Sequence, residues 1–147
     1  MKKFELTGVS VTLYSGEKLY RIRALVAFGD VKAGEFGGFV EKEENLSDGG
    51  NAWVYGNAWV TGNARVYGNA RVSGYAWVYG NAQVYGNAQV CANAQVYGNA
   101  QVYGNAQLFD NAQVSDNARV FDTAWVTDNV WVHGDARVSG NAWLSRL

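Results

Sequence analysis

The chain has 147 residues, 48% of them hydrophobic, and its 12 Lys and Arg residues nearly balance 13 Asp and Glu residues. This size fits one ordinary domain, and a net charge of −1 excludes a general attraction to long nucleic acid or anionic membranes. A single cysteine excludes an internal disulfide, and the opening residues lack the apolar run of a signal peptide or membrane span, so a cytoplasmic protein is expected.

Residues 1–37 are expected to form a β-hairpin. Two β-rich runs, FELTGVSVTLY and KLYRIRALVAF, are separated by the turn sequence SGE. A long repeat of short strands follows, and the end of such a stack exposes unpaired backbone groups and a cut core. We therefore expect the hairpin to cap the first coil of the repeat rather than to form a second domain.

The repeat begins at residue 52 and divides without insertion into sixteen hexads of the form Ala-x-Val-x-Gly-Asn. The first and third positions of each hexad are apolar and the second and fourth are mostly polar or aromatic, an alternation typical of a strand. Gly-Asn, or Asp-Asn late in the chain, tolerates the positive φ of a tight corner. The apolar spacing is two within a hexad and six between hexads, which excludes a helix.

Three hexads are expected to form one triangular coil of 18 residues, and successive coils stack about 4.8 Å apart. Val40 and Leu46 extend the apolar series backwards, with two extra residues in the turn LSDGGN before Val54. The eighteen inward positions predict six coils, a stack roughly 29 Å tall. Residues 38–147 would thus form the β-helix of one all-β structural domain.

The pattern aliphatic-x-x-x-small-x, seen in VYGNAQ and VTGNAR, resembles the hexapeptide-repeat proteins. These proteins form left-handed parallel β-helices, and many are trimeric acyltransferases. The resemblance covers residues 40–147 and alone implies the left-handed winding, because parallel crossovers are generally right-handed. The first segment with GGFVEKEENLS also resembles a bacterial and prophage branch usually labelled as acyltransferases. The implied fold is a left-handed parallel β-helix of about six triangular coils with an N-terminal hairpin cap, in a bacterial cytoplasm.

Stacking at 18 residues sorts the outward side chains into columns, and one face combines Arg or Gln with aromatic rings. Its residues are Arg65, Gln83, Gln101, Arg119 and Arg137 beside Tyr67, Tyr85, Tyr103, Phe121 and Ser139. Aromatic rings stack on planar ligands and guanidinium groups bind anions in bidentate fashion. The candidate ligand-binding residues are Arg65, Tyr67, Tyr85, Tyr103, Arg119, Phe121 and Arg137. The alternative is that the aromatic columns only stabilise stacked strands or bury against neighbouring subunits.

The other two faces are rich in tryptophan, which favours subunit contacts. The second face carries Trp59, Trp77, Gln95, Gln113 and Trp131 beside Thr61, Tyr79, Tyr97, Ser115 and His133, and the third carries Trp53, Arg71, Gln89, Gln107, Trp125 and Trp143. The predicted interface residues of a homotrimer are Trp59, Trp77, Tyr79, Tyr97 and Trp131. Leu144 and Leu147 are expected to join two trimers into a weaker hexamer.

His133 is the only histidine and the only ready general base near neutral pH. The resemblance implies an acyltransferase that uses a histidine between subunits, with acyl-CoA along the coils. The column pattern places His133 outward above Ser115, with Asp116 and Asp135 at nearby corners that could orient the ring. No long loop projects from a coil to wall a substrate pocket, which disfavours this alternative. One histidine also excludes the multi-histidine metal site of a gamma-type carbonic anhydrase.

Cys91 and the late aspartates are expected to have structural roles. As a nucleophile Cys91 would need a base, and His133 lies two coils away on another face. Corner positions are occupied by Asp110, Asp116, Asp122 and Asp128. Asp110 should stack on Asp128, and such a pair could hold a cation, but turn formation is the preferred interpretation. No metal and no cofactor are therefore expected, apart from acyl-CoA under the acyltransferase alternative.

The leading functional hypothesis is a non-enzymatic trimeric protein that binds a small anionic or nucleotide-like ligand, or a host protein partner, through aromatic and Arg/Gln faces. The prophage resemblance extends this hypothesis to a phage-borne inhibitor or sponge of a host defence system. The alternatives are the acyltransferase and a purely structural, self-assembling β-helix.

Overall fold

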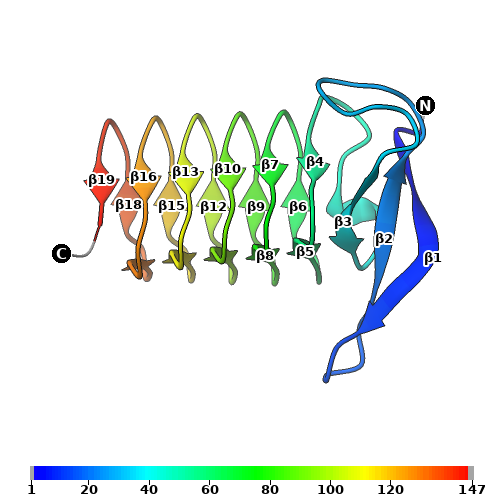
Figure 1. The fold of residues 1–147 in the computed structure, drawn as a ribbon. Coiled ribbons are helices and arrows are strands. Elements are labelled where there is room, and N and C mark those ends of the chain that lie inside the picture. The colour runs from blue at the N-terminus through cyan, green and yellow to red at the C-terminus, as the bar shows by residue number, and fades with distance from the viewer. Residues whose placement is uncertain (1, 146–147) are drawn as a thin grey trace.

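The computed structural model describes residues 2–145, which form a column of stacked coils with a longer hairpin at the N-terminal end (Figure 1). Apart from one 3₁₀ turn, η1 (Glu43–Asn45), the regular elements of this part of the chain are strands. They form three sheets. The all-β parallel solenoid of about six turns predicted from the hexads is confirmed. Its left-handed winding stays a prediction.

Each sheet runs along one side of the column. The eight-stranded sheet contains β1 (Phe4–Thr12), β2 (Lys18–Ala24), β3 (Phe36–Val40), β5 (Trp59–Val60), β8 (Trp77–Val78), β11 (Gln95–Val96), β14 (Gln113–Val114) and β17 (Trp131–Val132). The six-stranded sheet contains β4 (Trp53–Val54), β7 (Arg71–Val72), β10 (Gln89–Val90), β13 (Gln107–Leu108), β16 (Trp125–Val126) and β19 (Trp143–Leu144). The five-stranded sheet contains β6 (Arg65–Val66), β9 (Gln83–Val84), β12 (Gln101–Val102), β15 (Arg119–Val120) and β18 (Arg137–Val138).

Neighbouring strands of the coils pair in parallel with residues 18 positions apart. Gln95 pairs with Gln113 and Val96 with Val114, and the other two sheets repeat this register. The first coil differs, because Val40 pairs with Val60 and Leu46 bridges to Val66, an offset of 20. The two extra residues lie in the predicted turn, so the outward columns have the predicted membership from residue 52 onward.

The core consists of the alanines and valines at the first and third hexad positions. From Ala58 to Val126 these side chains are 0% exposed, with Leu108 in place of one valine. Because all three sides of each coil contribute one Ala and one Val, the interior fills with small and medium side chains and leaves no space for a ligand inside the column. Any binding site must use the outward side chains.

The corners are held in the left-handed backbone region. Gly98 has φ 67°, and a Cβ there would come within 2.8 Å of the backbone nitrogen of Asp116 in the next coil. Asp116 itself has φ 59°, and its Oδ2 accepts a hydrogen bond of 2.9 Å from the backbone nitrogen of Gly134. The carboxylate therefore offsets the strain of a non-glycine corner by satisfying a backbone N–H. This supports the predicted turn role of the late aspartates.

The N-terminal hairpin lies against the first coil, as expected for a cap. β1 pairs with β2, β2 pairs antiparallel with β3, and β3 pairs in parallel with β5, so hairpin and solenoid share one sheet. The boundary expected between residues 37 and 38 thus falls inside β3. Lys3, 3% exposed, donates from Nζ to the backbone oxygen of Ala52 at 2.7 Å.

Trp53 corrects one sequence-based expectation. The hexad pattern predicts an outward side chain on the third face, but the Trp53 side chain is 0% exposed and packs edge-on against Phe4 and Phe28, at centroid distances of 6.4 and 5.3 Å. Both phenylalanines come from the N-terminal segment. The outward position is buried because the hairpin and its following loop cover this end of the six-stranded sheet.

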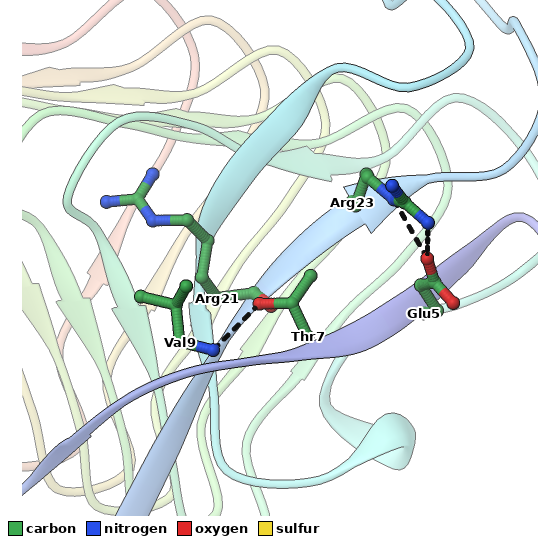
Figure 2. A network of polar contacts seen from close by, with 5 residues as sticks. All are labelled: Glu5, Thr7, Val9, Arg21 and Arg23. Carbon is green, nitrogen blue, oxygen red and sulfur yellow. Dashed lines mark hydrogen bonds and ion pairs between the residues drawn. The ribbon is translucent and has the colours of Figure 1, made fainter.

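At a register shift in β1, the Thr7 side chain forms hydrogen bonds with backbone groups. The register of β1 against β2 shifts between Leu6 and Ser10. At this shift the Thr7 hydroxyl donates to the backbone oxygen of Arg21 at 2.8 Å and accepts from the backbone nitrogen of Val9 at 3.3 Å (Figure 2). Arg23 forms an ion pair with Glu5 on the same strand pair (Figure 2).

Within residues 2–145, no helix has the length and apolar character needed to cross a membrane.

Candidate functional site

The predicted aromatic column of the five-stranded sheet is a continuous stack, which we call the tyrosine ladder: Tyr67, Tyr85, Tyr103 and Phe121. Successive ring centroids are 4.7, 4.9 and 5.1 Å apart, with interplanar angles of 4°, 4° and 3°. The stacking follows from the coil spacing, which places equivalent side chains one strand separation apart. The rings inside the ladder therefore cover one another's faces, and a ligand cannot stack between them.

The hydroxyl groups of the ladder are also used within the fold. Tyr67 donates to Gln83 Oε1 at 2.8 Å and Tyr85 donates to Gln101 Oε1 at 2.9 Å. The same pairing joins tyrosine and glutamine on the eight-stranded sheet, from Tyr79 to Gln95 at 3.2 Å and from Tyr97 to Gln113 at 3.0 Å. Sequence reasoning missed these pairs, although each is visible as a tyrosine with a glutamine 16 residues later.

Tryptophan replaces glutamine in this pairing where the preceding coil carries a small hydroxyl residue. Trp77 donates from Nε1 to Thr61 Oγ1 at 3.0 Å, and Trp131 donates to Ser115 Oγ at 2.7 Å. Thr61 and Ser115 are buried beneath the indoles. The variable outward side chains of the repeat therefore form hydrogen bonds between neighbouring coils, and most of them stabilise the stack.

The predicted arginines are brought to the same sheet but not to the same place. Arg119 and Arg137 are direct neighbours on β15 and β18, whereas two glutamines separate Arg65 from Arg119. Three strand spacings amount to about 14 Å, so a small ligand cannot contact both groups. The candidate ligand-binding residues form two separate ends of one face. Arg65 lies beside Tyr67 at one end, and Arg119 and Arg137 lie beside Phe121 at the other.

The glutamines and arginines of this face also differ in their bonding. Gln83 and Gln101 accept the tyrosine hydroxyls. Within residues 2–145 no hydrogen bond or ion pair involves the side chains of Arg65, Arg119 or Arg137. The three guanidinium groups are the charged donors of this face that the fold itself leaves unused.

The N-terminal end of the tyrosine ladder borders a hollow of about 450 Å³, which we call the ladder head. Its lining residues are Lys2, Glu43, Glu44, Leu46, Ser47, Asp48, Arg65, Val66 and Tyr67. Ser47 occupies the ladder position above Tyr67, because its backbone nitrogen donates to Val66 as that of Tyr67 donates to Val84. A serine replaces the aromatic ring of the later coils, so no ring covers this face of Tyr67.

The charges around the ladder head are partly paired. Lys2 Nζ lies 3.1 Å from Glu43 Oε1 and 3.8 Å from Asp48 Oδ2. In the described part of the chain neither Glu44 nor Arg65 has such a partner, and both are exposed. Burial raises the pKa of the Tyr67 hydroxyl, and Arg65 opposes that shift. Tyr67 therefore stays a neutral donor at physiological pH.

The predicted interface residues are exposed to different degrees. Trp59, Trp77, Tyr79 and Tyr97 are half-buried by their ladder contacts, whereas Trp131 is 54% exposed. Trp125 and Trp143 on the six-stranded sheet are also exposed and pack edge-on at 5.4 Å. Leu144 is half-buried against the core, and Leu147 lies outside the described residues.

His133 is placed on the outward surface of the eight-stranded sheet. Its ring lies 4.4 Å from the Trp131 indole, at an interplanar angle of 44°, and its side chain is exposed. The groups expected near the His133 ring have other partners. Ser115 accepts from Trp131, Asp116 from Gly134, and Asp135 from Asn117. No described carboxylate is hydrogen-bonded to the imidazole.

Cys91 and the stacked corner aspartates have local partners. Burial raises the pKa of the Cys91 thiol, with a further contribution from Asp110, so the reactive thiolate is disfavoured. Asp110 Oδ2 accepts from the backbone nitrogen of Asp128 at 3.2 Å. Nowhere in residues 2–145 do three or more His, Cys, Asp or Glu side chains gather in a way that could hold a metal ion.

Four segments of the chain are similar to the family described as the YdcK beta solenoid repeat. They are residues 64–80, 82–98, 94–108 and 112–128, all within the regular coils. The segments total less than half of the chain, and their similarity supports the repeat solenoid seen in the structure. No curated protein matches the chain. The hexapeptide-repeat resemblance and its acyltransferase label stay predictions.

Proposed function

We propose that the protein is a non-enzymatic binding scaffold that holds a small anionic, nucleotide-like ligand on the outer face of the five-stranded sheet. The observation that carries the proposal is a contrast within one column: glutamines accept tyrosine hydroxyls, whereas the arginine side chains have no partner among residues 2–145. Unused guanidinium groups beside aromatic rings provide bidentate contacts to phosphate and apolar contact to a planar base.

The rigidity of the stack supports binding. The ring ladder and the hydroxyl-to-glutamine bonds fix the side chains of this face before any ligand arrives. A preorganised surface loses little conformational entropy on binding. A protein that binds without turning over its ligand acts by sequestration. This is the mode expected of the sponge suggested by the prophage resemblance.

Thermal unfolding against a panel of cyclic and linear nucleotides tests the proposal. At least one nucleotide should raise the melting temperature, since a ligand that binds only the folded state stabilises it. The matching nucleosides, which lack phosphate, are the ligand control. The variant Arg65→Gln, Arg119→Gln, Arg137→Gln introduces the residue found at Gln83 and Gln101, so the stack is preserved. A panel without any shift, or a shift that survives in the triple variant, contradicts the proposal.

We also propose that three copies assemble through the tryptophan-bearing faces. Exposed aromatic surface of this kind is unusual on a monomer, and Trp131 and Trp143 are 54% and 64% exposed. Sedimentation of the protein should give a trimer that resists dilution. Trp131→Gln, which restores the residue found at Gln95 and Gln113, should weaken it. A stable monomer would reject the trimer.

The acyltransferase alternative depends on His133, which the structure leaves without an orienting carboxylate among residues 2–145. We expect no acetyl-CoA turnover that depends on this residue. Turnover abolished by His133→Ala, in a variant with an unchanged circular dichroism spectrum, would establish the alternative in place of the binding proposal.

A further inference from the structure

We propose that the ladder head is a binding site for a guanine nucleotide, an assignment that rests on the proposed binding function and narrows it to one end of the face. The base stacks on the open face of Tyr67, the Glu44 carboxylate accepts from the edge of the base, and Arg65 pairs with the phosphate. All three side chains line the same hollow.

The tyrosine ladder ends at Tyr67, because the preceding coil has no aromatic ring at this position. From Tyr67 to Phe121, adjacent rings of the ladder stack at centroid distances of 4.7 to 5.1 Å. One coil before Tyr67 the position belongs to Ser47, whose hydroxyl accepts from the backbone nitrogen of Gly49 at 3.1 Å. A planar base stacked on Tyr67 would extend the ladder by one ring, with a favourable stacking contact already set up by the coils.

The ladder head is lined by both acidic and basic side chains, and only some of them form ion pairs. Lys2 bridges Glu43 and Asp48 and so neutralises part of the acidic wall. Glu44 on η1 and Arg65 on β6 are exposed, and no described side chain pairs with either. A ligand that fits both groups carries hydrogen-bond donors at one end and negative charge at the other, which is the arrangement of a nucleotide with an amino-bearing base.

The Glu44 carboxylate distinguishes between the purine bases. A carboxylate accepts two parallel hydrogen bonds from guanine, through its ring N1–H and its 2-amino group. Adenine presents one amino donor beside a ring-nitrogen acceptor, which repels the second carboxylate oxygen. A matched bidentate pair discriminates between bases by roughly tenfold or more in affinity. Glu44 therefore favours guanine over adenine.

The size of the hollow agrees with this assignment. Its volume of about 450 Å³ falls within the range of small-molecule sites, roughly 300–1,000 Å³. Its walls come from segments far apart in sequence, namely Lys2 before β1, η1, the turn after Leu46, and β6. The site therefore exists only when the hairpin and the first coil are folded together.

Calorimetric titration of the full chain with GMP, AMP and guanosine tests the inference. We expect GMP to bind at least about tenfold more tightly than AMP, because only guanine matches the carboxylate. Guanosine, which lacks the phosphate that Arg65 would bind, should be weaker than GMP. Glu44→Gln and Arg65→Gln should each lower GMP affinity by about tenfold or more.

A further variant closes the site without removing a charge. Ser47→Tyr places a ring over Tyr67 and should abolish GMP binding while leaving the fold intact by circular dichroism. Arg71→Gln, on the six-stranded sheet and outside the candidate ligand-binding residues, is the matched control and should bind GMP as the unmodified protein does. Retained GMP affinity in Glu44→Gln and Ser47→Tyr would overturn the inference.

The outcomes separate the inference from the proposed function. If another nucleotide binds and its affinity depends on Arg119 and Arg137 but not on Glu44, the ladder head is rejected and the binding function stands. If neither GMP nor any other nucleotide binds the unmodified protein, both are rejected.

Discussion

The middle of the tyrosine ladder and its N-terminal end share the same strand-to-strand backbone hydrogen bonds, but they differ in whether the ring faces and polar groups are occupied. In the middle, Tyr85 stacks on both neighbours and bonds to Gln101, so its faces and its hydroxyl are occupied. At the end, Tyr67 meets Ser47 and a hollow lined by the Glu44 carboxylate and the Arg65 guanidinium, neither of which pairs with a described side chain. The regular aromatic column therefore stabilises the stack, and the proposed binding site lies where the repeat is interrupted.

The largest expected effect is on the N-terminal end of the stack. Phe4→Ala should lower the free energy of unfolding by about 3–5 kcal/mol, because Phe4 is 0% exposed and packs against the buried Trp53. Tyr14→Ala, at a fully exposed residue of the same hairpin, should change it by less than about 0.5 kcal/mol. Urea denaturation measures both. Equal losses would show that the hairpin does not stabilise the first coil.

A pH-dependent effect should follow from the same region. Burial lowers the pKa of Lys3 to about 8, while Asp48 opposes the shift. The unfolded chain holds this proton up to its ordinary pKa of 10.5, so the folded state binds fewer protons between these values and stability rises with pH. The gain between pH 8 and 10 should be roughly 2 kcal/mol.

Lys3→Met removes the titrating group and should flatten this part of the curve. Above pH 10 the trend should reverse, because burial raises the pKa of Tyr67 and Tyr85 and their unfolded forms lose protons first. Urea denaturation at several pH values measures the curve. A stability that falls between pH 8 and 10 in the unmodified protein would contradict the assignment to Lys3.

A smaller effect on stability should distinguish ladder tyrosines whose hydroxyl is hydrogen-bonded from those whose hydroxyl is not. Tyr85→Phe removes the bond to Gln101 but keeps the stack, and should cost about 1 kcal/mol. Tyr103→Phe is the matched control. The Tyr103 ring stacks equally, but its hydroxyl has no hydrogen bond to a described residue, so the change should be near zero. Thermal unfolding of both variants decides, and an equal loss would reject the role of the glutamine bond.

The smallest effect is expected at a corner. Asp116→Gly removes the acceptor for Gly134 but also removes the strain of a side chain at φ 59°, so stability should stay within about 0.5 kcal/mol. Asp116→Ala removes the acceptor and keeps the strain, so it should cost about 1 kcal/mol. If the two variants lose equal stability, the carboxylate does not offset backbone strain.

The sequence predicted the regular part of the molecule because its repeat is strict and local. The two-residue alternation within hexads specified the strands, and the 18-residue spacing placed Tyr67, Tyr85 and Tyr103 in one column. Trp53 was predicted incorrectly because its burial depends on Phe4 and Phe28, which are remote in sequence. No hexad pattern contains such contacts.

The ladder head was missed for the same physical reason. Its hollow forms where Lys2, η1 and the turn after Leu46 meet Arg65 and Tyr67, contacts that span tens of residues. The sequence did carry a signal, since the turn LSDGGN breaks the hexad spacing and puts Ser47 in a ladder position. The tyrosine-to-glutamine pairs were also readable from a spacing of 16 residues, once the stack was known.

The proposed site places nucleotide binding at the N-terminal end of the tyrosine ladder and not along it. Fluorine NMR of protein labelled with 3-fluorotyrosine tests it most directly, with signals assigned from Tyr67→Phe, Tyr85→Phe and Tyr103→Phe. On titration with GMP, the signal of Tyr67 should shift and broaden, while that of Tyr103, two coils away, should stay unchanged. A shift of Tyr103 without one of Tyr67, or no shift of any tyrosine at saturating GMP, would contradict the claim.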